Sequence, residues 1–138
     1  MAEAPFASAH ISEIGPYRPS EPGEAEWKAV RPHFGISAFG TTAYVARAPG
    51  EYVVPEHTEV EDSGTRHEEL FFVATGHAAF QVGGEEIDAP AGTFVFVRDP
   101  AIARAAVAHE AGTTVLAMGG EPGAAYSVSP WERKYVGE

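Results

Sequence analysis

Short β-prone segments separated by glycine and proline turns fill the middle of this sequence, from about residue 35 to residue 120. Segments this short and this regularly spaced are typical of a β-sandwich or β-barrel. Gly83 and Gly84 separate two of them and predict a two-residue hairpin turn. We expect strands over residues 35–48, 52–59, 67–74, 77–82, 85–88, 93–97, 102–108 and 113–118.

The segment before this region, residues 1–34, is a polar arm interrupted by prolines. Each proline fixes φ and removes a backbone donor, so we expect the arm to be largely irregular. Residues 21–30 predict one short helix, because Ser20 can cap it and because Trp27 and Val30 fall on one face.

The segment after it, residues 121–138, forms a tail. Ser129, Pro130 and Glu132 match a capping box with proline at the first helical position, which predicts a short terminal helix. That helix should cover Trp131 and Tyr135. The chain of 138 residues is about the size of one domain, which we divide into the arm (1–34), the barrel (35–120) and the tail (121–138).

Charge and composition exclude several classes of function. The 20 acidic and 9 basic side chains give a formal charge of −11, which repels nucleic acid and anionic membranes. The sequence shows neither a signal peptide nor an apolar run long enough to span a bilayer, so we expect a soluble, cytoplasmic protein. The absence of cysteine excludes disulfides and thiolate ligands. Any metal would therefore need His, Asp or Glu as ligands.

Residues 50–76 and 92–107 resemble the two motifs of the cupin superfamily. The first motif has a glycine, then His-x-His, and later a glutamate. The second motif is a glycine-led segment that ends in histidine and asparagine. Glu69 lies at the motif spacing before Gly76, and Gly92 begins the second motif. The resemblance covers about half of the chain and implies an all-β fold, the double-stranded β-helix or cupin jelly-roll barrel.

The metal centre that the resemblance implies, three histidines and one glutamate, is incomplete in this chain. Only Glu69 aligns cleanly. His57 lies one residue late for the first histidine, and Glu59 stands in the place of the second. The histidine and the asparagine of the second motif fall on Ala103 and Val107. An ordinary cupin metal site therefore cannot form.

Glu69 still needs a partner, because a buried, unpaired carboxylate costs several kcal/mol. Side chains alternate along a strand, so His67 shares a face with Glu69. One hypothesis is a divalent transition metal held by His57, Glu59, His67 and Glu69. The other is Arg104, whose guanidinium would replace the metal by a fixed cation. His57 and His67 are also compatible with a solvated position at the barrel mouth.

Three functions are compatible with this sequence. The first is a small-molecule-binding protein whose apolar barrel, lined by Phe71, Val73 and Phe94 or Phe96, holds a ligand oriented by Glu69. The second is a metal-dependent oxygenase, isomerase or lyase with a rearranged His/Glu site and Glu69 as a catalytic residue. The third is a structural or interaction protein with a filled barrel. Whether the chain is an enzyme stays open.

Two further expectations concern the surface of the barrel. Arg104 is a candidate ligand-binding residue beside the barrel interior, and residues 60–66 resemble a loop inserted at its mouth. Residues 70–74 and 93–97 are apolar on both faces, so we expect both faces to be covered. We therefore expect a homodimer, as the resemblance to cupins also implies.

Overall fold

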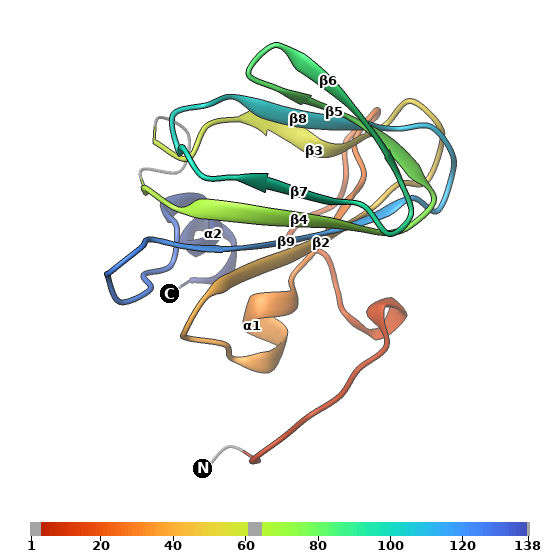
Figure 1. The fold of residues 1–138 in the computed structure, drawn as a ribbon. Helices are drawn as coiled ribbons and strands as arrows, with labels where there is room; N and C mark the ends of the chain where they lie inside the picture. The colour runs from red at the N-terminus through yellow and green to blue at the C-terminus, as the bar shows by residue number, and fades with distance from the viewer. Residues whose placement is uncertain (1–3, 61–64, 138) are drawn as a thin grey trace.

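The computed structural model describes residues 4–60 and 65–137, which form two facing antiparallel β-sheets (Figure 1). The five-stranded sheet has the order β1-β2-β9-β4-β7, and the four-stranded sheet has the order β3-β8-β5-β6. The strands are β1 (Glu26–Lys28), β2 (Gly40–Val45), β3 (Tyr52–His57), β4 (Glu68–Thr75), β5 (His77–Val82), β6 (Glu85–Pro90), β7 (Phe94–Val97), β8 (Arg104–Ala108) and β9 (Thr114–Gly120). The helices are the 3-10 helix η1 (Ile11–Glu13), α1 (Val30–Phe34) and α2 (Pro130–Val136).

Alternation along the strands places the hydrophobic core between the two sheets. On β4, Phe71 and Val73 are fully buried, and Phe71 packs against Phe80 of β5 with ring centroids 5.4 Å apart. Leu70 and Phe72 are only partly buried and alternate with these core residues, so they face outwards. The predicted all-β fold is confirmed.

Each of the eight predicted strands is present, with ends shifted by a few residues. The hairpin prediction is also confirmed, because Gly83 and Gly84 join β5 to β6 with positive φ angles of 57° and 85°. Glycine adopts such angles without strain, and two in succession are typical of a tight hairpin turn. Of the loop predicted over residues 60–66, residues 61–64 lie outside the described part of the chain.

The helix predicted over residues 21–30 is wrong. Its second half is the edge strand β1, which pairs with β2 and places Trp27 opposite Tyr44. Backbone pairing with an exposed sheet edge and burial of Trp27 against Tyr44, 6.2 Å away, outweigh local helix propensity. The helix of the arm, α1, begins only at Val30.

The predicted terminal helix exists as α2, but the predicted side-chain cap does not. The Ser129 side chain makes no capping hydrogen bond, and its carbonyl accepts from the backbone N–H groups of Glu132 and Arg133. Ser129 is buried and borders the cavity described below.

The tail is fixed to the arm by aromatic packing and by a buried ion pair. Trp131 meets Tyr17 and Trp27 edge to face, with centroids 5.1 and 6.0 Å apart. Glu132 pairs with Arg31 and accepts a 2.7 Å hydrogen bond from the Tyr17 hydroxyl. The arm and the tail therefore pack together beside the five-stranded sheet. In the described ranges, no helix has the length and apolar character needed to cross a membrane.

Candidate functional site

A cavity of about 300 Å³ lies at the mouth of the barrel. Its wall is formed by strands β1, β2, β3, β4 and β9, by Glu59 and His67 just outside these strands, and by the tail. Its polar end contains His57, Glu59, His67 and Glu69, the four residues that the sequence nominated as metal ligands. The structure thus brings these four residues to one place.

An irregularity in β3 places His57 in the site. Val54 and His57 are three residues apart, yet they pair with Ala106 and Arg104 of β8, which are two residues apart. An extra residue in one strand returns the next side chain to the same face of the sheet. His57, one residue late by motif counting, therefore still reaches the barrel interior.

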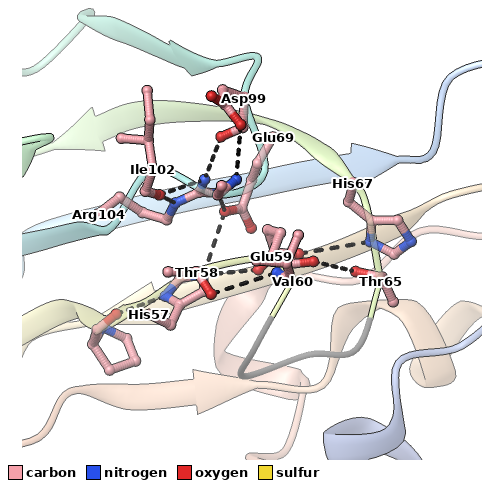
Figure 2. Close-up of polar contacts among 12 residues, drawn as sticks. His57, Thr58, Glu59, Val60, Thr65, His67, Glu69, Asp99, Ile102 and Arg104 are labelled. Atoms are coloured by element: carbon pink, nitrogen blue, oxygen red, sulfur yellow. Dashed lines mark hydrogen bonds and ion pairs between the residues drawn. The ribbon is translucent and has the colours of Figure 1, made fainter.

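The two nitrogens of the His57 ring have different partners. Nδ1 lies 2.7 Å from the Pro55 carbonyl, which can only accept, so Nδ1 carries a proton. Nε2 faces Glu59 Oε2 at 3.0 Å and Glu69 Oε1 at 3.5 Å (Figure 2). Burial lowers the pKa of His57, but the two carboxylates outweigh burial and raise it to about 10. His57 is therefore an imidazolium at neutral pH.

Arg104 provides a second cation for Glu69. Its side chain is fully buried, and Nη1 lies 3.1 Å from Glu69 Oε1. The other guanidinium nitrogens donate to the carbonyls of Ile102 and Asp99 (Figure 2). Arg104 thus satisfies Glu69 as the second hypothesis expected, through one nitrogen. It does not border the cavity and keeps no exposed donor for a ligand.

Three of the nominated ligands form a group that could hold a metal. One donor atom each from His57, Glu59 and Glu69 lie within 4.8 Å of one another. One imidazole and two carboxylates suit a divalent transition metal such as Zn or Mn. His67 stands beside this group, with Nδ1 3.7 Å from Glu59 Oε1 and its ring packed against Tyr126 at an interplanar angle of 31°. The donor set therefore fits a metal with three protein ligands.

Comparison with solved structures shows which architecture this is. A protein with a double-stranded β-helix domain from Klebsiella pneumoniae has a TM-score of 0.63 and 18% identity, and the match covers 92% of this chain and 98% of that one. A cupin protein from Bacteroides fragilis has a TM-score of 0.56 and 16% identity, with coverage of 81% and 90%.

The chain has the cupin fold.

A third cupin-fold likeness is to a putative sugar phosphate isomerase from Acidithiobacillus ferrooxidans, with a TM-score of 0.58 and 20% identity. The match covers 71% of this chain but only 60% of that protein. No family model and no curated protein sequence matches this chain. At these identities the likenesses show the fold alone.

The register of the cupin barrel explains the altered second motif. Ala103, which stands where the resemblance expects a histidine, is exposed, whereas the next residue, Arg104, is fully buried. The side chain that points into the barrel is therefore one residue later than the motif expects. It is the guanidinium of Arg104, which pairs with Glu69 without a metal.

The hydrophobic residues predicted to bind a ligand lie elsewhere. Phe71 and Val73 are fully buried in the core and are absent from the cavity wall, because the deeper part of the barrel is filled by their packing with Phe80. Phe94 and Phe96 are 63% and 44% exposed, on the outer face of the sheet. The structure therefore gives none of these four phenylalanine and valine side chains a place in the cavity.

No pattern in the sequence predicted the aromatic wall of the cavity. It consists of Trp27, Tyr44, Tyr126, Trp131 and Tyr135. Four of these lie in the arm or the tail, outside the motifs that drew attention to the barrel. The clustering of aromatic residues near both ends of the chain was the available signal, but only their contact across the fold makes them a wall.

Proposed function

We propose that this protein binds a small organic molecule in the cavity at the mouth of its cupin barrel. One observation carries the proposal. The cavity joins a polar end, where His57, Glu59 and Glu69 converge, to an aromatic wall. Concave sites with apolar walls and a few convergent polar groups are the usual form of small-molecule sites.

The polar end would orient the ligand. Glu59 and Glu69 offer carboxylate oxygens, and His57 and Arg104 hold both carboxylates in place. Groups fixed in this way keep their geometry when a ligand replaces water, which favours specific binding. Glu69 remains the candidate for a catalytic role, since it contacts both cations and borders the cavity.

A thermal-denaturation screen of small metabolites, covering amines, acids, sugars and nucleosides, tests the proposal. A ligand present at 100 times its Kd should stabilise the protein by about 2.7 kcal/mol. Ala117→Phe fills the cavity from its β9 wall without altering charge and should abolish the shift. A compound that stabilises both proteins equally would bind elsewhere, and a screen without any stabilising compound would contradict the proposal.

A metal-dependent enzyme is the second candidate, favoured by the convergence of His57, Glu59 and Glu69. A metal bound there would act as a Lewis acid on a ligand oxygen. The chain itself would supply the three donors, and the Pro55 carbonyl would fix the ring orientation of His57. Arg104 would fix the orientation of the Glu69 carboxylate.

Metal analysis of protein purified without an affinity tag tests this candidate. Stoichiometric Zn, Mn, Fe or Ni in the wild type, lost in His57→Gln, would support it. His33→Gln, an exposed histidine far along the sequence from the site, is the matched control. Metal-free protein after growth in metal-supplemented medium would refute it.

We also propose a homodimer formed through the outer face of the five-stranded sheet. Leu70, Phe72, Phe94 and Phe96 lie on neighbouring strands, with the rings of Phe72 and Phe94 4.5 Å apart. A contiguous exposed apolar face of this kind marks an interaction surface. A second copy of the chain would cover it face to face.

A further inference from the structure

The charged residues that border the cavity are almost all acidic. Glu56, Glu59, Glu69 and Glu132 contribute to its wall, together with His57 and His67, while no lysine or arginine of residues 4–60 and 65–137 does. Imidazolium His57 lies in the wall, and the guanidinium groups of Arg104 and Arg31 lie behind it, so the four carboxylates leave a small excess of negative charge at the cavity. A phosphate or carboxylate group of a ligand would meet this negative charge without a lysine or arginine to pair with.

The nearby guanidinium groups offset part of this negative charge but offer no donor to an anionic ligand. Arg104 is fully buried behind Glu69, with its nitrogens directed at Glu69 and at two carbonyls. Arg31 is 3% exposed, pairs with Glu132 and donates to the Ile36 carbonyl. Both cations stabilise protein groups and neither lies in the cavity wall.

The histidines are engaged in the same way. Both ring nitrogens of His57 face protein acceptors, the Pro55 carbonyl and the carboxylates of Glu59 and Glu69. His67 packs against Tyr126 and turns Nδ1 towards Glu59. Glu56, by contrast, is exposed at the rim and has no ion-pair partner in the described ranges.

The aromatic wall also favours a positively charged ligand. Trp27 meets Tyr44 and Trp131 at interplanar angles of 79° and 86°, so neighbouring rings stand nearly perpendicular. Aromatic faces attract cations through their quadrupoles. Arg18 already shows this for Trp27, with its guanidinium carbon 4.6 Å from the ring centroid. Perpendicular rings beside carboxylates suit an ammonium group attached to an apolar body.

From this combination we infer that the cavity takes a small organic cation, an amine or alkylammonium with an apolar or aromatic body. The inference rests on the proposed ligand-binding function and narrows it to one chemical class. It predicts that phosphorylated and carboxylated molecules bind this cavity weakly.

Three matched probes test this inference: benzylamine, benzyl alcohol and benzoate share one ring and differ in charge. The chain has two tryptophans, Trp27 and Trp131, and both border the cavity, so tryptophan fluorescence reports binding there. Untagged protein is titrated as purified and again after dialysis against a chelator. We expect benzylamine to bind about tenfold more tightly than benzyl alcohol, and benzoate most weakly.

A rim variant separates charge from shape. Glu56→Gln removes one exposed carboxylate without touching the ion pairs of the site. It should weaken benzylamine binding about threefold and leave benzyl alcohol unchanged. Glu86→Gln, an exposed carboxylate on β6 outside the cavity wall, is the matched control and should change neither.

The outcomes distinguish this inference from the function on which it rests. Benzoate binding at least as tightly as benzylamine, in either form of the protein, overturns the cation inference but leaves a ligand-binding cavity. Equal affinity for benzylamine and benzyl alcohol also overturns the inference. If none of the three probes changes the fluorescence up to its solubility limit, both the inference and the ligand-binding function fail.

Discussion

Two cations approach Glu69 inside the barrel from different strands. Arg104 of β8 and His57 at the end of β3 lie 3.1 and 3.5 Å from the same carboxylate oxygen. An ion placed in such surroundings is stable only while its partners remain. The effect of a single substitution at this site therefore depends on which charge it leaves unpaired.

Glu69→Gln should destabilise the protein by roughly 3 kcal/mol, because it leaves the fully buried Arg104 without its carboxylate. Adding Arg104→Met should recover part of the loss. Urea denaturation measures both, and Arg98→Gln, at an exposed pair with Glu68, should change stability by less than about 0.5 kcal/mol. A Glu69→Gln protein as stable as the wild type would show that the pair contributes nothing.

The pKa of His57 predicts a loss of stability at alkaline pH. Its pKa is about 10 in the folded protein and near 6.5 when exposed, so the folded state binds the extra proton. The stabilisation is fully present below about pH 6.5 and declines as pH rises towards 10. His57→Gln should remove this part of the pH dependence in denaturation curves, whereas His33→Gln should retain it. Parallel curves for the wild type and His57→Gln would disprove the shift.

At the scale of elements, the tail helix α2 matters because it closes the cavity and ties the two ends of the chain together. Arg31 of α1 and Glu132 of α2 are each 3% exposed. Burial, together with the neighbouring Glu132 carboxylate, raises the pKa of Tyr17, so its hydroxyl stays protonated and donates to Glu132. The ion pair and this hydrogen bond fix the position of Trp131 in the cavity wall.

Glu132→Gln should lower the free energy of unfolding by about 3 kcal/mol, because it leaves the buried Arg31 guanidinium without its carboxylate. Urea unfolding followed by tryptophan fluorescence should show the loss, with an altered emission of the native state. Glu121→Gln, an exposed carboxylate in the same tail, is the control. If Glu132→Gln unfolds like the control, the ion pair does not secure the tail.

Ser129→Ala should lower the free energy of unfolding by less than the roughly 1 kcal/mol of a lost helix cap, because the Ser129 hydroxyl makes no capping bond.

At the scale of the whole molecule, the two faces of the five-stranded sheet have different roles. The inner face packs against the four-stranded sheet and carries Glu69, whereas the outer face exposes Phe94 and Phe96. The outer face therefore exposes apolar surface to solvent, and association of two copies would bury it.

Phe94→Lys should weaken the proposed dimer, because a charge would lie in the apolar contact. Light scattering at micromolar concentration should report a dimer for the wild type and a smaller mass for this variant. Tyr52→Lys changes an aromatic residue of similar exposure, 48%, on the four-stranded sheet and should leave the mass unchanged. A wild-type protein that is monomeric at every concentration would refute the dimer.

Local sequence was enough to predict much of this fold. Strand alternation and turn chemistry act over a few residues, so the eight strands of the barrel and the Gly83–Gly84 hairpin could be predicted. The same alternation placed His67 and Glu69 on one face, and the burial cost of a carboxylate pointed to Arg104. The arm helix over residues 21–30 was mispredicted because a sheet edge, formed by distant residues, captured that segment as β1.

By itself, then, the sequence determined the all-β barrel and the residues that could converge on Glu69, because these follow from periodicity and from the cost of buried charge. Only the tertiary structure decided how they meet. The irregular pairing of β3 with β8 turned His57 and Arg104 inwards, and the packing of arm against tail built the aromatic wall. Strand register and contacts between chain ends depend on residues far apart in sequence, so no local pattern could specify them.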